Sequence, residues 1–187
     1  MALLWLLSVS SFLICLAVAQ NGQEEQQGAC FQFYGNGYLK FNLRDFNNHG
    51  HAHYSMKFET SIPNGILMYS RGEHYDDEAL FLRDGKLNYH LFNTSPNGIG
   101  GQFGGLFQGE VPVNIGDSIE VHVYRAFNVR DETQRREVQQ TGLVYTVNGR
   151  TYTHVDNRIR TGISLSPEVY IGGYKERLVN SRTHISI

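Results

Sequence analysis

Hydrophobic and polar residues alternate with a period of two along most of the chain that follows residue 30. In HYSMKFET, for example, Tyr54, Met56 and Phe58 fall on one side, and the same alternation returns in KLNYHL and in SIEVHVYR. Successive side chains of a β-strand point to opposite faces of its sheet, so this pattern predicts strands with one buried face. Since no long stretch shows the 3.6-residue period of a helix, the sequence predicts an all-β domain.

Two dipeptides predict tight turns between these strands. Asp84-Gly85 lies between residues 79–83 and residues 86–92, and Asn148-Gly149 lies inside GLVYTVNGRTYTHV. Both central positions of a two-residue hairpin turn favour positive φ, which glycine adopts freely and Asp or Asn tolerates. We therefore expect two antiparallel hairpins, and for the whole domain a two-sheet antiparallel sandwich. The charged stretch RDETQRREVQQ, between two strands, should form an extended hairpin tip or one short helical turn.

The start of the chain has a different pattern. Residues 1–19 are apolar and uncharged and end in the small residues Ala17-Val18-Ala19, which is typical of a secretion signal cleaved near Ala19. No Lys or Arg precedes the apolar run, so an uncleaved membrane anchor is the alternative. Residues 20–29 are polar and lack periodicity, and we expect them to form a flexible lead. The folded domain is therefore expected over residues 30–187 of a secreted protein.

Length and charge narrow the function classes. With 187 residues and 21.2 kDa, the chain has room for one ordinary domain. The formal net charge is -2, with 16 basic and 18 acidic residues mixed along the chain. This balance excludes a general electrostatic attraction to nucleic acid, which is therefore not an expected partner. After signal cleavage, no membrane span is expected.

The two cysteines raise the question of disulfide pairing. Cys15 lies in the expected signal and would be removed with it, which leaves Cys30 as an unpaired cysteine in a compartment where thiols are oxidised. Cys30 could join a disulfide-linked partner chain, remain a buried thiol, or pair with a cysteine outside the given sequence. Spacing alone does not choose among these three.

Four motifs, in this order and spacing, resemble those of a laminin G-like (LNS) domain of the laminin, neurexin and agrin class. They are FETSIPNGILMYSRG, DDEALFLRDGKLNYHL, GLVYTVNG and VYIGGY, and the resemblance covers roughly Cys30 to Tyr174. It implies a jelly-roll sandwich of the concanavalin or legume-lectin type. It also implies a non-enzymatic function, in which loops at one rim bind proteins or acidic glycans, often around a calcium ion.

The resemblance suggests a calcium site. Calcium-binding members have an aspartate nine residues before the glycine of the DG turn, which is Asp76 here. Calcium takes oxygen ligands, so a main-chain carbonyl near Phe92 or Asn93 would contribute as well. The second acidic or amide ligand falls at Ser166, whose hydroxyl replaces a carboxylate poorly, and Glu168 could substitute only if its loop shifts. The alternative is that the acidic residues 76–78 form a solvated loop before a strand.

Other departures from the family pattern concern the later strands. Where family members have a Trp-His pair, this chain has Ser118 and Ile119. Family members also continue to a last strand with a Gly-Cys pair, which is lacking here. Either residues 183–187 form that strand and close the sandwich, or the domain is C-terminally incomplete and exposes a sheet edge.

Three further features suggest ligands or modification. His49, His51 and His53 alternate, which could direct their imidazoles to one side of a strand and hold zinc or copper, although a polar loop is the simpler interpretation. Asn93-Thr94-Ser95 is an N-glycosylation acceptor, weakened by the following Pro96. Basic residues around the charged hairpin could bind a sulfated glycan, but acidic residues interleave with them. These basic residues are Arg125, Arg130, Arg135 and Arg136.

We expect a secreted recognition module rather than an enzyme. Its partners would be extracellular or cell-surface proteins, or acidic glycans. A small lectin for neutral sugars is the alternative, and would need aromatic platforms such as Tyr75 or Tyr124. A glycoside hydrolase on the same sandwich would need paired carboxylates across a cleft, whereas Glu120 stands on its strand face without an acidic neighbour.

Overall fold

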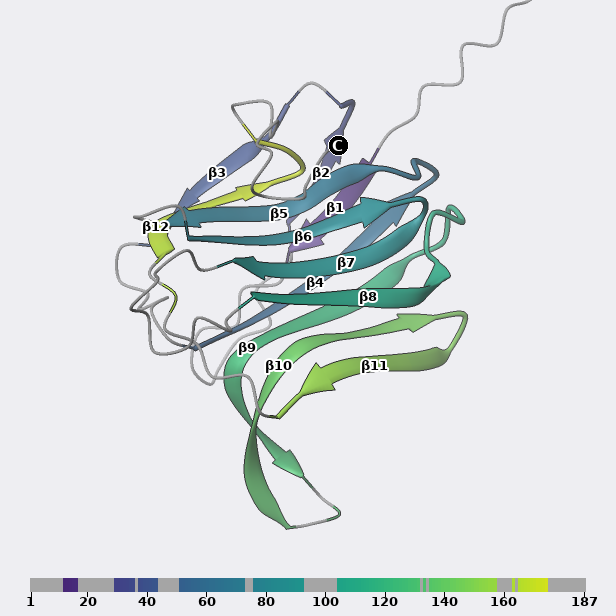
Figure 1. The fold of residues 1–187 in the computed structure, drawn as a ribbon. Helices are drawn as coiled ribbons and strands as arrows, with labels where there is room; N and C mark the ends of the chain where they lie inside the picture. Colours follow the sequence, from purple (N-terminus) through teal and green to yellow (C-terminus); the bar gives the residue numbers. More distant parts are fainter. Residues whose placement is uncertain are drawn as a thin grey trace, which may run out of the picture.

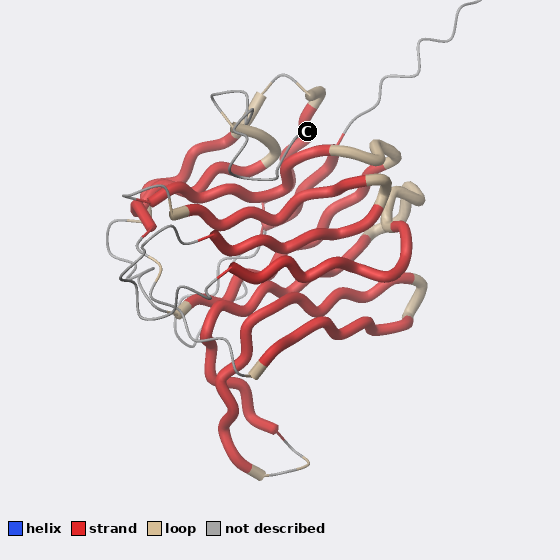
Figure 2. Tube along the Cα trace, viewed as in Figure 1, coloured by secondary structure: helices blue, strands red, loops and turns tan. Residues whose placement is uncertain are grey.

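In the computed structural model, most of the described residues are in β-strands. The structure describes residues 12–16, 29–35, 37–43, 51–72, 76–92, 104–131, 133, 135–157, 163 and 165–174. Every regular element in these residues is a strand (Figure 2). Within the same residues there is no helix of the length and hydropathy that crossing a membrane requires.

Twelve strands cover the described residues. They are β1 (Phe12–Leu16), β2 (Ala29–Phe33), β3 (Leu39–Asn42), β4 (Ala52–Thr60), β5 (Gly65–Gly72), β6 (Asp77–Arg83), β7 (Lys86–Phe92), β8 (Gly104–Pro112), β9 (Ile119–Asp131), β10 (Arg136–Val147), β11 (Arg150–Asp156) and β12 (Leu165–Ile171).

These strands form two six-stranded sheets. Sheet A has the order β11-β10-β9-β4-β1-β2, and sheet B has the order β3-β12-β5-β6-β7-β8. All their pairings are antiparallel. The two sheets stack face to face (Figure 1). The predicted two-sheet antiparallel sandwich is therefore confirmed.

The core lies between the sheets and follows the period of two. Leu80 and Leu82 of β6 face inward from sheet B, and Val121 and Val123 of β9 face them from sheet A, all with no exposed surface. Full burial of one such side chain contributes about 1.5–3 kcal/mol relative to exposure. Met56 and Phe58 of β4 are buried in the same core, as the alternation of their strand predicted.

Both predicted hairpin turns are confirmed. Asp84 and Gly85 have φ of 51° and 75°, and Asn148 and Gly149 have φ of 50° and 74°. Positive φ at both central positions matches the twist of the flanking strands. A side chain at position 85 would also place its Cβ 2.2 Å from Oδ1 of Asn114, so glycine is required there for space as well.

The charged stretch 130–140 forms an extended hairpin rather than a helical turn. β9 and β10 pair as far as Asp131 and Arg136, and this hairpin projects beyond the sandwich (Figure 1). At its base the register shifts between Gln140 and Gly142. Ala126 has a φ of 46° at this bulge, and its backbone N–H donates to Oγ1 of Thr141 at 3.0 Å. A bulge bends its strand and raises the local twist, which redirects the hairpin away from the sheet.

β1 lies inside the segment expected to be a signal. It pairs with β4 on one side and β2 on the other, and Ile14 has no exposed surface. The strand pairing therefore begins before the expected limit of residue 30. Cleavage near Ala19 remains a prediction, and it would remove β1.

In the intact chain Cys30 on β2 is disulfide-bonded, which contradicts the expectation of an unpaired cysteine and of a disulfide-linked partner chain. The physical reason is the register of β1, which places the backbone of Cys15, the other cysteine of the sequence, directly opposite Cys30. Neighbouring antiparallel strands bring Cα atoms to the separation that disulfides favour. Cleavage near Ala19 would remove Cys15.

Candidate functional site at the rim of sheet B

Four neighbouring strands of sheet B start or finish at the same end of the sheet. The register pairs Leu165 with Gly72, Arg71 with Asp77, and Asp77 with Phe92. We call this end of the sheet, where β5 and β7 finish and β6 and β12 begin, the sheet B rim. It gathers the segments in which the resemblance implied calcium ligands.

The predicted ligand residues lie on different strands of this rim, and one of them is outside the described residues. Asp76 directly precedes β6, and Ser166 is the second residue of β12. Because β5 separates β12 from β6, their backbones lie two strand spacings apart, about 10 Å. Asn93 follows the end of β7 but lies outside the described residues, so its roles as carbonyl ligand and glycosylation acceptor stay predictions.

The acidic residues at the rim are buried, so the alternative of a solvated loop is wrong. Asp76 is 4% exposed, Asp77 1% and Glu78 0%. The backbone holds this segment against β5, because the N–H of Gly72 donates to the carbonyl oxygen of Asp76 at 2.8 Å. Burying carboxylates is costly unless they are paired, hydrogen-bonded or bound to metal, and the contacts of Asp77 differ from those of Glu78.

Asp77 has a raised pKa. Burial raises it most, Arg71 lowers it, and the carboxylates of Asp76 and Glu78 raise it, so that the pKa moves from 3.8 to about 7. Its Oδ1 lies 3.7 Å from Nδ1 of His90. Near neutral pH the Asp77 carboxyl group is therefore partly protonated, and it binds a cation only by losing that proton.

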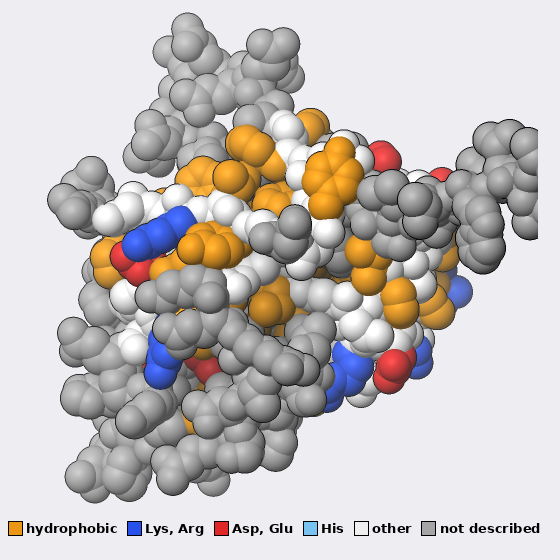
Figure 3. Space-filling model, turned by 90° about the horizontal axis from the view of Figure 1, so that it is seen from above, with side chains coloured by type: hydrophobic (Ala, Val, Ile, Leu, Met, Phe, Trp, Pro, Cys, Tyr) orange, Lys and Arg blue, Asp and Glu red, His pale blue; other side chains and the backbone are white. Residues whose placement is uncertain are grey.

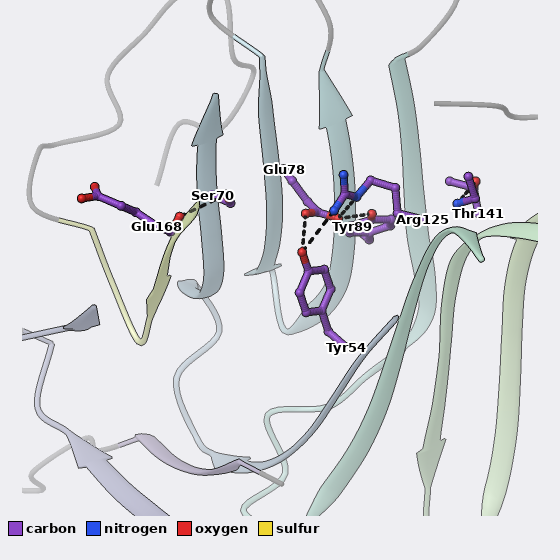
Figure 4. A network of polar contacts seen from close by, with 8 residues as sticks. Tyr54, Ser70, Glu78, Tyr89, Arg125, Thr141 and Glu168 are labelled. Atoms are coloured by element: carbon purple, nitrogen blue, oxygen red, sulfur yellow. Dashed lines mark hydrogen bonds and ion pairs between the residues drawn. The ribbon is translucent and has the colours of Figure 1, made fainter. Parts of the chain in front are cut away.

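Glu78 belongs to a buried network between the two sheets (Figure 4). Its Oε1 lies 3.3 Å from Nε of Arg125 and accepts a hydrogen bond from the hydroxyl of Tyr89 at 2.5 Å. Tyr54 donates to Oε2 of Glu78 at 3.2 Å and accepts a hydrogen bond from Arg125 at 3.3 Å. The network joins β6 and β7 of sheet B to β4 and β9 of sheet A. Glu78 is thus committed to the core rather than to the rim.

The charges of this network favour the ion pair. Burial raises the pKa of Tyr54 and of Tyr89, and the Glu78 carboxylate raises both further, so the two tyrosines stay neutral donors. Burial alone would lower the pKa of Arg125, but Glu78, Tyr54 and Tyr89 together outweigh burial, and the pKa is raised. Arg125 therefore keeps its proton and its charge.

Arg125 is not available to a glycan, which corrects the sequence prediction. Its side chain has no exposed surface, because Arg125 occupies an inward position of β9 and not the projecting hairpin. The other three predicted glycan contacts, Arg130, Arg135 and Arg136, are exposed on that hairpin. Seen from above, the described surface has basic and acidic side chains in small groups between hydrophobic and polar ones (Figure 3).

Ser166 and Glu168 already have local partners. Oγ of Ser166 accepts a hydrogen bond from the backbone N–H of Glu168 at 3.2 Å. The carboxylate of Glu168 forms an ion pair with Lys40 and accepts a hydrogen bond from the hydroxyl of Tyr170 at 3.0 Å. A shift of Glu168 into the rim would break both contacts, so it is a poor substitute ligand.

Only two of the three histidines predicted as possible metal ligands lie in the described residues. His49 lies outside the described residues, whereas His51 and His53 are both exposed. Among the described residues, no group of three or more His, Cys, Asp or Glu side chains is arranged to hold a metal ion. A ligand set at the rim would therefore have to draw on main-chain oxygens or on the segments next to the strand ends.

One solved structure shows which fold this is. The chain is similar to domains LG4-5 of the mouse laminin alpha1 chain, with a TM-score of 0.56 at 15% sequence identity. The match covers 80% of this chain and 36% of that one. The fold is that of a laminin G-like domain. No protein-family model matches the sequence, and no curated protein matches it. The laminin G-like fold, together with its jelly-roll sandwich, is thus established by structure.

Sequence reasoning missed the buried ion pair between Glu78 and Arg125. Leu80 and Leu82 share their side of β6 with Glu78, and Val121 and Val123 share their side of β9 with Arg125. The alternation that identified the strands therefore placed one acid and one base on facing inner surfaces. This alternation was the signal in the sequence from which the buried pair could have been predicted.

Proposed function

We propose that this protein is a secreted, non-enzymatic recognition module. It binds an extracellular-matrix or cell-surface protein, or an acidic glycan, through the loops at the sheet B rim. The laminin G-like fold supports a binding role in general. The observation that carries the choice of the rim is the burial of Asp76 and Asp77 where four strands end. Two adjacent enclosed carboxylates are stabilised by a bound cation.

Calcium is the cation that we propose for this rim. Asp76 would supply a carboxylate, the end of β7 would supply main-chain oxygen, and the hydroxyl of Ser166 would have to take the place of the second side-chain ligand. Calcium requires six to eight oxygen ligands, so water or the partner would complete the shell. With one strong ligand and a partly protonated neighbour in Asp77, we expect a dissociation constant of about 0.1–1 mM, typical of extracellular modules.

The test is a calorimetric titration of calcium into chelator-treated protein. We expect saturable binding that is lost, or weakened at least tenfold, in Asp76→Ala. Glu59→Ala is the matched control, since Glu59 is an exposed carboxylate on β4 of the other sheet. Binding that survives in Asp76→Ala, or that is absent at millimolar calcium, would exclude a calcium-assisted rim.

The remaining alternatives are less well supported. Tyr124 is poorly placed as a platform for a neutral sugar, because the ring of His53 stacks on one of its faces at 4.7 Å with an interplanar angle of 9°. Tyr75 lies outside the described residues. Glu78 is neutralised by Arg125 and so is a poor candidate for an acid in glycoside hydrolysis. Secretion rests on residues 1–19, and the N-terminal sequence of the exported protein tests it.

A further inference from the structure

Two histidines meet on the outer face of sheet A, away from the rim. His53 is on β4 and His122 is on the neighbouring β9. The register pairs His53 with Tyr124 and Ser55 with His122, so the two imidazoles are diagonal neighbours across the ladder. Their nitrogens approach closely, with Nε2 of His53 lying 3.2 Å from Nδ1 of His122.

This separation fits two imidazoles bound to one metal ion. Zinc–nitrogen bonds are about 2.0–2.1 Å long, so two nitrogens on a tetrahedral ion lie about 3.3 Å apart. The 3.2 Å measured between the His53 and His122 nitrogens is close to that value. Without an ion, one ring must donate a proton to the other in a hydrogen bond. A metal ion would replace that shared proton.

The surroundings of the pair also resemble those of metal-binding histidines. The second nitrogen of His122, Nε2, lies 3.5 Å from Oε1 of Glu120, and carboxylates in this position orient a histidine ligand and raise its basicity. The ring of His53 is positioned by Tyr124, which stacks on it, and by Phe127, whose ring centroid is 5.3 Å away.

We propose that His53 Nε2 and His122 Nδ1 form a binding site for a divalent transition metal ion such as Zn²⁺ or Cu²⁺. Imidazole suits these ions, whereas calcium prefers oxygen, so the site is distinct from the rim. Within the described residues no third His, Cys, Asp or Glu joins the pair, so the other coordination positions are open to water or to a partner's side chain. Copper should bind more tightly than zinc.

The test is a titration of Cu²⁺ and of Zn²⁺ into the full chain after chelator treatment. We expect binding to weaken at least tenfold in His53→Ala and in His122→Ala, and about tenfold in Glu120→Gln. His51→Ala is the matched control, because His51 is an exposed histidine just before β4, and it should change affinity less than twofold. Nitrogen coupling in the Cu²⁺ spin-resonance spectrum should indicate two imidazoles.

Three outcomes would overturn the proposal. They are unchanged affinity in both His53→Ala and His122→Ala, equal weakening in all three histidine variants, or a spectrum with a single nitrogen ligand. Thermal unfolding of each variant identifies loss of fold as a cause, and His122→Gln then replaces His122→Ala, since it retains bulk and a hydrogen-bonding group. Failure of this site leaves the calcium titration at the rim unaffected, because the ligands are different.

Discussion

At the scale of single residues, loss of the contact between Glu78 and Arg125 should destabilise the domain most. Both side chains have no exposed surface, and two tyrosine hydroxyls contact the pair. A buried ion pair contributes little more stability than apolar residues of similar size. Removal of one partner, however, leaves the other charge buried and uncompensated. The cost of a mutation therefore depends on whether the other charge remains.

Replacing one of the two charged residues should lower the free energy of unfolding far more than replacing both. We expect Arg125→Met to lower the free energy of unfolding by about 3–5 kcal/mol, because Glu78 is left charged and buried. The double variant Arg125→Met with Glu78→Leu should recover most of this loss. Urea denaturation of the two single variants and the double variant measures the coupling, and strictly additive losses would contradict a direct charge interaction.

Single residues also show what sequence reasoning can reach. The resemblance singles out Asp76 by its distance from a turn glycine on the same chain segment, and its role as a calcium ligand stays a prediction. Arg125 was misassigned because it precedes a charged hairpin in sequence, while the side of the strand that it faces decided its burial. The contact between His53 and His122 joins residues 69 positions apart, and such pairing between distant strands has no local signal.

At the scale of elements, the base of the β9–β10 hairpin is a fixed bend. Ala126 has a φ of 46°, a conformation that costs an alanine about 1–2 kcal/mol. Gly142, across the bulge, has a φ of 142°, and a Cβ there would lie 2.1 Å from the carbonyl oxygen of His154. The bend thus needs one residue without a side chain and tolerates strain at another.

Two small substitutions at this bend should have opposite effects. Gly142→Ala should destabilise the domain by about 2 kcal/mol or more, because the new methyl group would collide with the backbone of β11. Ala126→Gly should be neutral or stabilise it by up to about 1 kcal/mol, since glycine adopts positive φ without strain. Chemical denaturation measures both effects. A Gly142→Ala variant of unchanged stability would show that the backbone of β11 moves to make room for the methyl group.

Two strands escaped sequence prediction for identifiable physical reasons. An apolar run such as that of β1 has no alternation to separate a buried strand from a signal segment. β8 lies in a glycine-rich region, and glycine weakens the strand signal. In the structure Gly109 faces the ring of Tyr145, where a Cβ would lie 3.0 Å from the tyrosine hydroxyl oxygen, so a small residue is needed there. The strands with clear alternation were predicted correctly.

At the scale of the whole molecule, two separate surfaces could meet a partner. The rim has enclosed acidic groups, whereas the projecting hairpin has exposed Arg130, Arg135 and Arg136. On the hairpin the ladder sets Glu137 opposite Arg130 and Asp131 opposite Arg136, which moderates its positive charge. A sulfated glycan would therefore meet a modest basic surface.

Retention on a heparin column tests the hairpin surface. We expect the triple variant Arg130→Ser, Arg135→Ser and Arg136→Ser to elute at lower salt, with affinity reduced roughly tenfold if each exposed contact contributes about 0.5 kcal/mol. Arg150→Ser is the matched control, because Arg150 is exposed at a different turn. Equal elution of the triple variant and the unmodified protein would remove the hairpin as a glycan contact.

The Glu78–Arg125 contact also sets the geometry between these two surfaces. Glu78 lies two residues after Asp76 at the rim, and Arg125 directly precedes Ala126 at the base of the hairpin. One ion pair without exposed surface therefore connects the strand that begins at the rim to the base of the hairpin that carries Arg130, Arg135 and Arg136. A partner long enough to reach both would meet them at a constant spacing and angle. The domain would then select partners by length, as a ruler does, as well as by chemistry.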